Sequence, residues 1–191
     1  EERFDAANLV LHGLWPQPMD NVYCNVDNNL KNLDKNKKWS ELPPIDLSEE
    51  TLRELAIKMP GVASDLHLHE WYKHGTCYSN SPEEYFQESM ALLDQVNNSE
   101  VRDLLVNNIG KPVTSSEIRN EFARAFSNGA GDKVQVQCER DNNENRRMIT
   151  ELQINLKGEI EPNTSIASLF QSGKTVAAGC NVAEVDPVGF D

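Results

Sequence analysis

Residues 66–77 have the sequence LHLHEWYKHGTC, which contains three of the chain's four histidines. The fourth histidine, His12, lies in residues 11–16, whose sequence is LHGLWP. Imidazole, carboxylate and ammonium groups can together perform acid–base chemistry on a phosphate, because one imidazole removes a proton, another donates one, and the cation stabilises the developing negative charge. Three interpretations of residues 66–77 are therefore open: a zinc site, a group of buried structural histidines, and a metal-free acid–base site.

A zinc site fits these residues poorly. The helical metalloprotease motif HExxH places two histidines four residues apart on one helix face. Here the residue three after Glu70 is Lys73, and the histidine follows at position 74. His67 and His69 could still bind a metal from a strand, with His12 or His74 as a third ligand.

A purely structural role is the usual explanation for one isolated histidine. Four histidines gathered with Glu70 and Lys73 weaken that explanation. The residues therefore favour a metal-free acid–base site, and we expect no metal and no other cofactor.

Together the two stretches resemble the two active-site signatures of the ribonuclease T2 family, the secreted acid ribonucleases. The first signature is roughly xHGLWP, and residues 11–16 match it throughout. The second is roughly hydrophobic-x-x-H-E-aromatic-x-K-H-G-x-C, and residues 66–77 match every fixed position. The resemblance looks closer to the bacterial members than to the plant members.

The resemblance implies a ribonuclease T2-like α+β fold, with an antiparallel sheet packed against several helices. We expect residues 1–191 to form a single catalytic domain. Family members usually have a further aromatic-rich strand before the first signature, and the eleven residues before His12 do not obviously supply it. The expected domain therefore lacks that strand.

The resemblance also implies an activity: metal-free transphosphorylation of single-stranded RNA through a 2′,3′-cyclic phosphate. By analogy with the family, His74 is the general base and His12 is the general acid. His69 binds the phosphate, and Glu70 and Lys73 stabilise the transition state. With unperturbed imidazole pKa values near 6.5, a bell-shaped profile centred on mildly acidic pH follows. The 2′-hydroxyl is the nucleophile, so we expect no cleavage of DNA.

Three aromatic or amide residues are candidates for binding the RNA base. Single-stranded RNA exposes base faces, so recognition by stacking is expected. Trp15 is the best platform, although a core position explains it equally well, and Tyr23 is expected to close the same pocket. Gln17 lies where some family members have an acidic residue. Its amide both donates and accepts hydrogen bonds, so we expect little base specificity.

The composition limits the alternatives. The 191 residues have a net charge of −13 and are 38% hydrophobic, which is ordinary for a globular protein. No apolar run approaches the roughly 18–20 residues needed to span a bilayer, so we expect no membrane association. We also expect a monomer. The acidic balance excludes a broad basic surface for nucleic acid. The runner-up function is a secreted binding or toxin-like module with incidental ribonuclease activity.

Four cysteines, Cys24, Cys77, Cys138 and Cys180, form no CxxC pair. Two disulfides are favoured over four free thiols, which implies an oxidising compartment, either the periplasm or the outside of the cell. The residues alone leave three pairings open. The resemblance to the T2 family selects Cys24–Cys77 and Cys138–Cys180.

Local patterns predict four helices and a hairpin. The helices are expected to start near Ser48, Ser81, Ser99 and Thr114, with capping residues at Ser48, Ser81 and Thr114. Period-two alternation at residues 133–138 and 148–156 predicts an antiparallel hairpin, with a turn at residues 141–143. We also expect a short strand at residues 9–11 and a long loop at residues 20–46.

Overall fold

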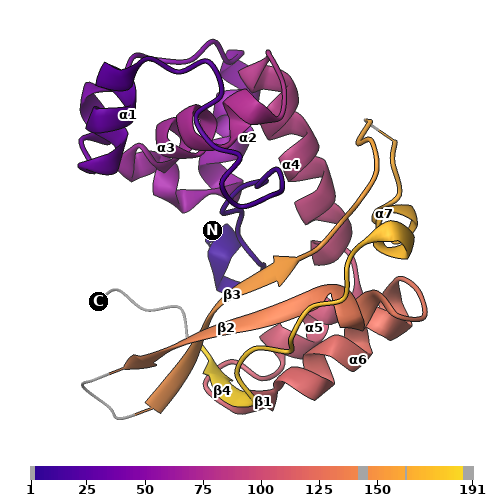
Figure 1. Ribbon diagram of the computed structural model, residues 1–191. Helices are drawn as coiled ribbons and strands as arrows, with labels where there is room; N and C mark the ends of the chain where they lie inside the picture. The colour runs from indigo at the N-terminus through magenta and orange to yellow at the C-terminus, as the bar shows by residue number, and fades with distance from the viewer. Residues whose placement is uncertain (1–2, 142–145, 162, 187–191) are drawn as a thin grey trace. The chain divides into compact units, whose positions relative to one another are not determined.

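The structure, a computed structural model, describes residues 3–141, 146–161 and 163–186. The chain forms two compact units (Figure 1), which we call the helical unit, Val10–Leu93, and the sheet unit, Glu1–Leu9 with Asp94–Asp191. No helix within the described ranges is both long and apolar enough to cross a membrane. The single catalytic domain over residues 1–191 stays a prediction.

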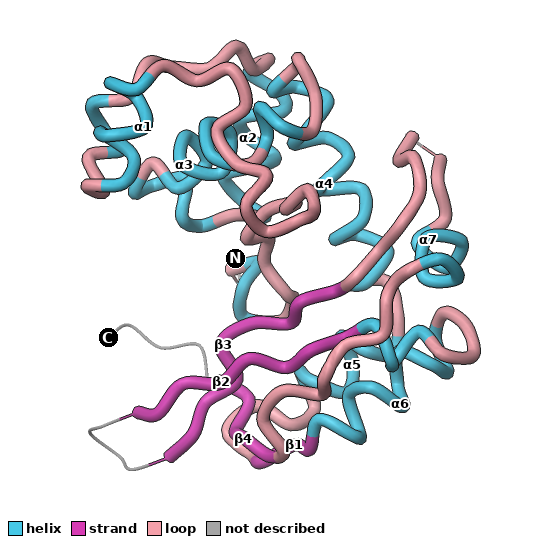
Figure 2. The backbone as a smooth tube through the Cα atoms, in the orientation of Figure 1, coloured by secondary structure: helices cyan, strands magenta, loops and turns pink. Residues whose placement is uncertain are grey.

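Four helices make up the helical unit, joined by short 3₁₀ turns (Figure 2). The helices are α1 (Asn28–Lys35), α2 (Glu49–Lys58), α3 (Leu66–Lys73) and α4 (Pro82–Asn97), whose last residues belong to the sheet unit. The 3₁₀ turns are η2 (Trp39–Glu41), η3 (Pro60–Ser64) and η4 (Gly75–Cys77). Its core consists of Leu55, Met59, Trp71, Tyr85, Phe86 and Met90. Trp71 is thus the core residue among the aromatics of the second signature.

The predicted helix starts in this unit are confirmed. The Ser48 hydroxyl caps α2 by accepting the Thr51 N–H, and the Ser81 hydroxyl accepts the Glu84 N–H at the start of α4. The buried residues of α2 are Thr51, Leu55 and Lys58, and its C-cap residue Met59 is fully buried as well, whereas Leu52 is 40% exposed.

The prediction of a long loop at residues 20–46 is wrong, because α1 lies inside it. This helix has only two leucines, Leu30 and Leu33, among asparagines and lysines, so its apolar stripe is too weak to identify from the pattern. What it buries is polar: Asp34 is 2% exposed. Its two leucines are only half-buried, so the most buried side chain of α1 is the charged Asp34.

The sheet unit contains a four-stranded sheet in the order β1-β4-β3-β2. Its elements are η1 (Phe4–Ala6), α5 (Glu100–Val106), β1 (Pro112–Thr114), α6 (Ser115–Ala125), η5 (Ala130–Lys133), β2 (Val134–Asp141), β3 (Arg146–Ile154), α7 (Ile166–Ser172) and β4 (Val182–Val185). Strands β2 and β3 form the predicted antiparallel hairpin. The predicted turn lies partly outside the described residues. The α+β class is confirmed, but the sheet is mixed, because β3 pairs with β4 in parallel.

Two further local predictions in the sheet unit have opposite outcomes. The Thr114–Glu117 capping box is present at the start of α6, with both reciprocal hydrogen bonds. The strand expected at residues 9–11 does not form. The Leu9 N–H and C=O are bonded to the Asn97 side chain rather than to a strand, so this segment has no ladder to join.

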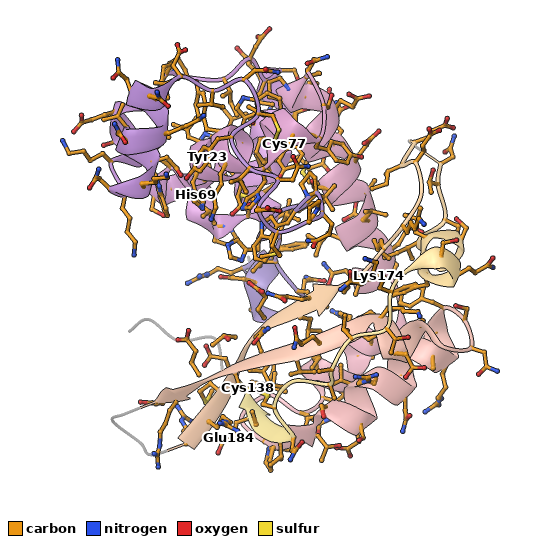
Figure 3. The ribbon with its side chains drawn as sticks, in the orientation of Figure 1. Tyr23, His69, Cys77, Cys138, Lys174 and Glu184 are labelled. Atoms are coloured by element: carbon orange, nitrogen blue, oxygen red, sulfur yellow. A yellow bond between two sulfur atoms is a disulfide. The ribbon has the colours of Figure 1, made fainter. Side chains whose placement is uncertain are left out.

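Each unit contains one disulfide. Cys24 is joined to Cys77 in the helical unit, and Cys138 to Cys180 in the sheet unit; Figure 3 labels Cys77 and Cys138. These are the pairs that the family resemblance implies. Because each bridge closes within one unit, each unit is cross-linked independently of the other.

Candidate active site

Helix α3 and the turn after it position four of the five catalytic candidates. His69, Glu70 and Lys73 lie on the helix, and His74 is its C-cap residue, where the chain turns into η4. Residues four apart lie on one helix face, so Glu70 and His74 share a face, and His69 and Lys73 share the next. At Gly75 a Cβ atom would lie 2.4 Å from the Trp71 ring, so only glycine allows the turn directly after His74.

The first signature, residues 11–16, has no regular secondary structure and is held by side chains from α3 and α4. The buried Tyr85 hydroxyl donates to the Leu14 carbonyl at 2.9 Å and accepts the Leu14 N–H at 3.1 Å. The Trp15 indole N–H donates to Glu70 Oε2 at 2.8 Å. A Cβ on Gly13 would lie 2.1 Å from that same oxygen, so the glycine allows the carboxylate its close approach.

These contacts bring both signatures to one point. His12 Nε2 lies 3.4 Å from Glu70 Oε1, and His69 Nε2 lies 3.8 Å from the same atom. The Trp15 ring centroid lies 5.0 Å from that of His12 and 5.4 Å from that of His74. The imidazoles of His12 and His74 therefore contact one indole, although they are 62 positions apart in the chain.

Glu70 is an unusual carboxyl group because it is fully buried. Burial raises its pKa, and the charge of His12, the Trp15 hydrogen bond and the charges of His69 and Lys73 oppose the increase only in part. Its Oε1 atom has no hydrogen-bond partner among the residues that the structure describes. The nearest cationic groups to this oxygen are the imidazoles of His12 and His69, whose Nε2 atoms lie at 3.4 and 3.8 Å.

His74 differs sharply from His12 in its surroundings. The His12 side chain is 47% exposed, whereas His74 is buried. Burial, together with the positive charges of Lys73, His69 and His12, lowers the pKa of His74 to about 4, and Asp34 opposes this only weakly. The ring of His74 is therefore neutral above that pH, which is the state that a general base needs.

A third group of residues surrounds His69. Its Nδ1 lies 2.7 Å from Asp34 Oδ1, and the Tyr23 hydroxyl donates to Asp34 Oδ2 at 2.6 Å. Figure 3 shows Tyr23 and His69 beside each other. Burial alone would raise the pKa of Asp34, but the hydrogen bonds from His69 and Tyr23 and the charges of His69 and Lys73 hold it below its usual range. Asp34 is therefore an ionised carboxylate.

The three predicted base-binding residues have different surroundings. Trp15 is half-buried and its indole N–H is bonded to Glu70. Gln17 is exposed, and its amide N–H groups contact the Trp15 carbonyl and the Met19 sulfur. Tyr23 is buried, with its hydroxyl bonded to Asp34. A base-binding role for these residues stays a prediction, and Tyr23 offers no free hydroxyl for it.

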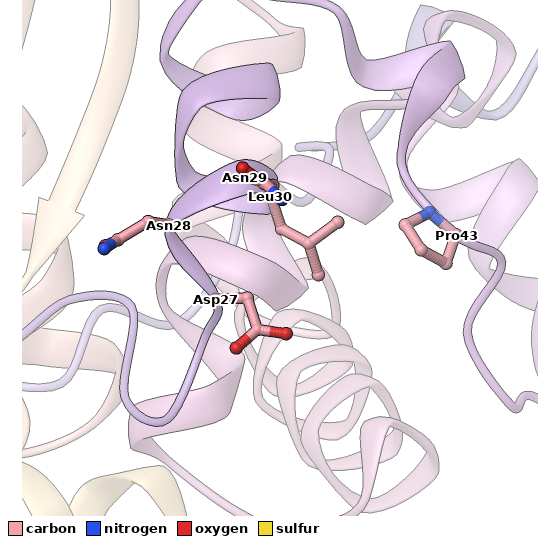
Figure 4. Close-up of a pocket in the computed structure, with 5 residues that line it drawn as sticks. All are labelled: Asp27, Asn28, Asn29, Leu30 and Pro43. Atoms are coloured by element: carbon pink, nitrogen blue, oxygen red, sulfur yellow. The ribbon is translucent and has the colours of Figure 1, made fainter.

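Residues outside the signatures line an open pocket of about 510 Å³ (Figure 4). Its lining consists of Asp27, Asn28, Asn29, Leu30 and Pro43, around the first turn of α1. None of these residues is an acid–base candidate. The pocket is therefore separate from the histidine cluster, and we assign it no part in the chemistry.

A metal could use part of the same cluster. His69, Glu70 and His74 offer ligand atoms within 4.8 Å of one another, and two of the three side chains are buried. Two imidazoles and a carboxylate are a ligand set that zinc accepts. His67, which the sequence suggested as a ligand, is not part of this group. The metal and acid–base interpretations thus require the same three side chains.

Comparison with known proteins identifies the family. The sequence model described as the Ribonuclease T2 family matches residues 2–168. The chain belongs to the ribonuclease T2 family. Two curated relatives are Ribonuclease I of Escherichia coli (strain K12), 29% identical over 79% of this chain and 61% of the relative, and Ribonuclease 1 of Arabidopsis thaliana, 28% identical over 75% and 60%. The chain thus spans about 60% of the length of the curated relatives it matches.

A T2 ribonuclease is also among the solved structures that share this fold. The crystal structure of Actibind, described as a T2 ribonuclease, aligns with a TM-score of 0.53 at 17% identity, covering 97% of this chain and 81% of that chain. At this identity the likeness shows the fold alone. It supports the α+β class of this member of the T2 family.

Sequence patterns did not reveal the structural role of three residues that build the site. Asp34 lies in a segment that had been interpreted as a loop, and nothing in the sequence marks it as the partner of His69. Tyr85 follows a predicted helix cap and resembles any core aromatic residue. Gly13 was visible within the T2 signature, but its purpose depends on the position of Glu70, which only the fold provides.

Proposed function

We propose that this T2-family chain is an endoribonuclease that cleaves single-stranded RNA by metal-free transphosphorylation. The observation that supports this best is the contact of the His12 and His74 rings with one indole, that of Trp15. An acid and a base on one phosphodiester must be held together in this way, because the proton is removed on one side of phosphorus and supplied on the other.

In the first step, neutral His74 removes the proton from the 2′-hydroxyl. The 2′-oxygen forms a bond to phosphorus, the bond from phosphorus to the 5′-oxygen breaks, and His12 gives its proton to the leaving oxygen. The product is a 2′,3′-cyclic phosphate. The burial of His74 and the exposure of His12 suit these roles, since the base must be neutral and the acid must reach a solvated leaving group.

In the second step, water opens the cyclic phosphate and the two histidines exchange roles. His12, having lost its proton, accepts one from water as the water oxygen bonds to phosphorus. The bond from phosphorus to the 2′-oxygen breaks, and His74 returns its proton to that oxygen, which leaves a 3′-phosphate. His69 binds the phosphate in both steps. Lys73 supplies positive charge, and Glu70 supports the neighbouring imidazoles as charge builds on the phosphate oxygens.

Base recognition in this proposal is loose. Gln17 is the exposed polar group next to Trp15, and an amide can donate and accept hydrogen bonds equally. A net charge of −13 gives little long-range attraction to RNA, so local contacts must provide most of the affinity. We expect a monomer that neither cuts DNA nor binds membranes.

The proposed compartment is oxidising, either periplasmic or extracellular. Two disulfides support it, because such bridges persist mainly outside the cytosol. One curated relative, from Solanum lycopersicum, is named Extracellular ribonuclease LE, at 27% identity over 75% of this chain.

A zinc-dependent phosphodiesterase is the second candidate, supported by the close approach of His69, Glu70 and His74. One assay separates the two. The protein is incubated with a single-stranded RNA and with the DNA of the same sequence, each with and without EDTA, and the products are identified by mass.

Cleavage of RNA alone, unaffected by EDTA and yielding a cyclic phosphate, is the expected result. Cleavage that EDTA abolishes would favour zinc. Cleavage of DNA would exclude the 2′-hydroxyl as the nucleophile. Absence of any cleavage would favour a binding module of the same fold.

A further inference from the structure

Asp34 is a buried carboxylate that belongs to neither signature. It lies on α1 and is 2% exposed. Both of its oxygens are used: Oδ1 lies 2.7 Å from His69 Nδ1, and Oδ2 accepts the Tyr23 hydroxyl at 2.6 Å. Burying a charge is costly unless it is paired and hydrogen-bonded, so a carboxylate at this position needs both partners.

The His69 ring is held on a second side by Trp39. The two rings stack at 4.8 Å between centroids, with 29° between their planes. The Trp39 indole N–H donates to the Asp34 backbone carbonyl at 3.3 Å. Asp34 therefore contacts the imidazole directly and also anchors the aromatic ring that covers its face.

The hydrogen bond fixes which nitrogen of His69 has the proton. The two Asp34 oxygens face the Tyr23 hydroxyl and the His69 ring, so the carboxylate acts as the acceptor at both. Nδ1 must therefore donate to Asp34, which leaves Nε2 as the ring nitrogen that can donate to a phosphate oxygen when it carries a proton. That atom lies on the catalytic side of the ring, 3.8 Å from Glu70 Oε1.

We propose that Asp34 is a positioning residue for the reaction: it accepts a hydrogen bond from His69 Nδ1–H and so orients the ring with Nε2–H directed at an oxygen of the scissile phosphate. The proposal rests on the proposed ribonuclease function and names one more residue that the site needs. Asp34 touches neither RNA nor the reacting atoms, and it acts only through His69. The Tyr23 hydroxyl donates to the second oxygen of Asp34, which helps to hold the carboxylate against the imidazole.

The chain provides a matched control in Glu88. This carboxylate is also buried in the helical unit and also accepts a tyrosine hydroxyl, that of Tyr78. Glu88→Gln and Asp34→Asn therefore make the same chemical change in similar surroundings. Any cost of a buried amide for folding should appear in both variants, whereas loss of catalysis should appear only in Asp34→Asn.

The test is a double-mutant cycle on kcat/KM with a single-stranded RNA, comparing the wild-type protein, Asp34→Asn, His69→Ala and the double variant. We expect Asp34→Asn to lower kcat/KM by about 10–100-fold, as the loss of a partner behind an active-site histidine typically does. In the His69→Ala background the same change should cost less than about threefold, because its target is gone. Glu88→Gln should retain wild-type kcat/KM.

An equal factor in both backgrounds would overturn the proposal, as would a loss no greater than that of Glu88→Gln. A second measurement needs neither a variant nor activity. The ¹⁵N chemical shifts of the His69 ring in the wild-type protein report its tautomer, and Nδ1–H is expected. A His69 ring without a proton on Nδ1 would refute the positioning role even if RNA is cleaved. A ring with that proton, in a protein that cleaves no RNA, would retain the Asp34–His69 contact and reject only the ribonuclease function.

Discussion

The two units use buried polar groups in opposite ways. Of the eight polar or charged residues that are buried in the described part of the chain, seven lie in the helical unit and only Ser115 lies in the sheet unit. In the same described part of the chain, three buried side-chain atoms have no hydrogen-bond partner. They belong to His67, Glu70 and His74, which all lie in the helical unit. The sheet unit instead buries apolar side chains such as Val134, Phe122 and Phe170.

This difference suggests that the helical unit contains the catalytic groups and that the sheet unit contributes mainly to stability. Unpaired buried polar atoms destabilise a fold. Two of these three atoms belong to the catalytic candidates Glu70 and His74, and the third belongs to His67, which has no assigned role. The sheet unit has no such atoms among its described residues, and its ion pairs are partly or largely exposed. The chemistry is therefore expected to depend on the helical unit, and the sheet unit should tolerate damage that changes stability without changing kcat.

The largest expected effect is loss of the proton-transfer groups. His12→Ala or His74→Ala should lower kcat on RNA by about 10²–10⁴-fold, since each removes a general acid or base. Steady-state kinetics on a defined RNA measures this. His67→Ala is the control, because His67 lies on the same helix but has no assigned role. Near-normal turnover of His12→Ala or His74→Ala would contradict the assignment.

Removing the two disulfides separately should distinguish the units. The bridges close 53 and 42 residues, so the chain-entropy argument predicts that each loss lowers the free energy of unfolding by about 4 kcal/mol. The Cys24→Ser/Cys77→Ser variant should also lose kcat, because Cys77 ends the turn that begins at His74.

The Cys138→Ser/Cys180→Ser variant should lose stability and retain kcat, as measured by urea unfolding alongside RNA kinetics. Equal losses of kcat in both variants would contradict the division between the units. These assays should be run where both variants remain folded.

Two glycines offer a finer comparison. A Cβ at Gly13 would lie 2.1 Å from Glu70 Oε2, and a Cβ at Gly131 in the sheet unit would lie 2.0 Å from the Arg119 carbonyl oxygen. Each substitution to alanine should cost about 1–3 kcal/mol of stability through overpacking. Only Gly13→Ala should lower kcat of the folded protein, because it displaces a catalytic carboxylate. Unchanged kcat in Gly13→Ala would contradict the role of Glu70.

The smallest predicted effect is on pH dependence. His74 has a pKa of about 4 in the fold and an ordinary value near 6.5 when unfolded, so the unfolded chain binds the proton more readily between these values. The stability that neutral His74 provides is therefore complete above pH 6.5 and is lost as the pH falls toward 4, by on the order of 1–3 kcal/mol.

As the pH is lowered from 7 to 4, the urea midpoint should thus fall more steeply in the wild-type protein than in His74→Gln. The variant cannot titrate at this position. The acidic limb of kcat should also lie near pH 4, lower than an unperturbed histidine would give. Parallel stability curves for the two proteins would contradict the burial argument.

Local sequence patterns correctly predicted the helix caps and the hairpin, because neighbouring residues determine these elements. The cap at Ser48, the box at Thr114 and Glu117, and the alternation of β2 and β3 each depend on a few neighbouring residues. The two signatures likewise identified the histidines. The parallel pairing of β3 with β4 was not predictable, because its two strands are far apart in the chain and β4 has only four residues.

The electrostatics of the site could not be predicted for a similar reason. The sequence shows that Glu70 and His74 are four residues apart, but their pKa shifts come from burial by other segments. Asp34 shows the limit most clearly. Its importance depends on α1 packing against α3, and α1 has too few leucines to be recognised as a helix.

The bonds of the Tyr85 hydroxyl have a mechanical consequence for the first signature. One phenol on α4 both donates to and accepts from the Leu14 peptide groups. A segment with neither helix nor strand thus takes its rigidity from a helix more than seventy positions away. His12, the proposed proton donor, lies two residues before Leu14, so we expect loosening of α4 to disturb its position.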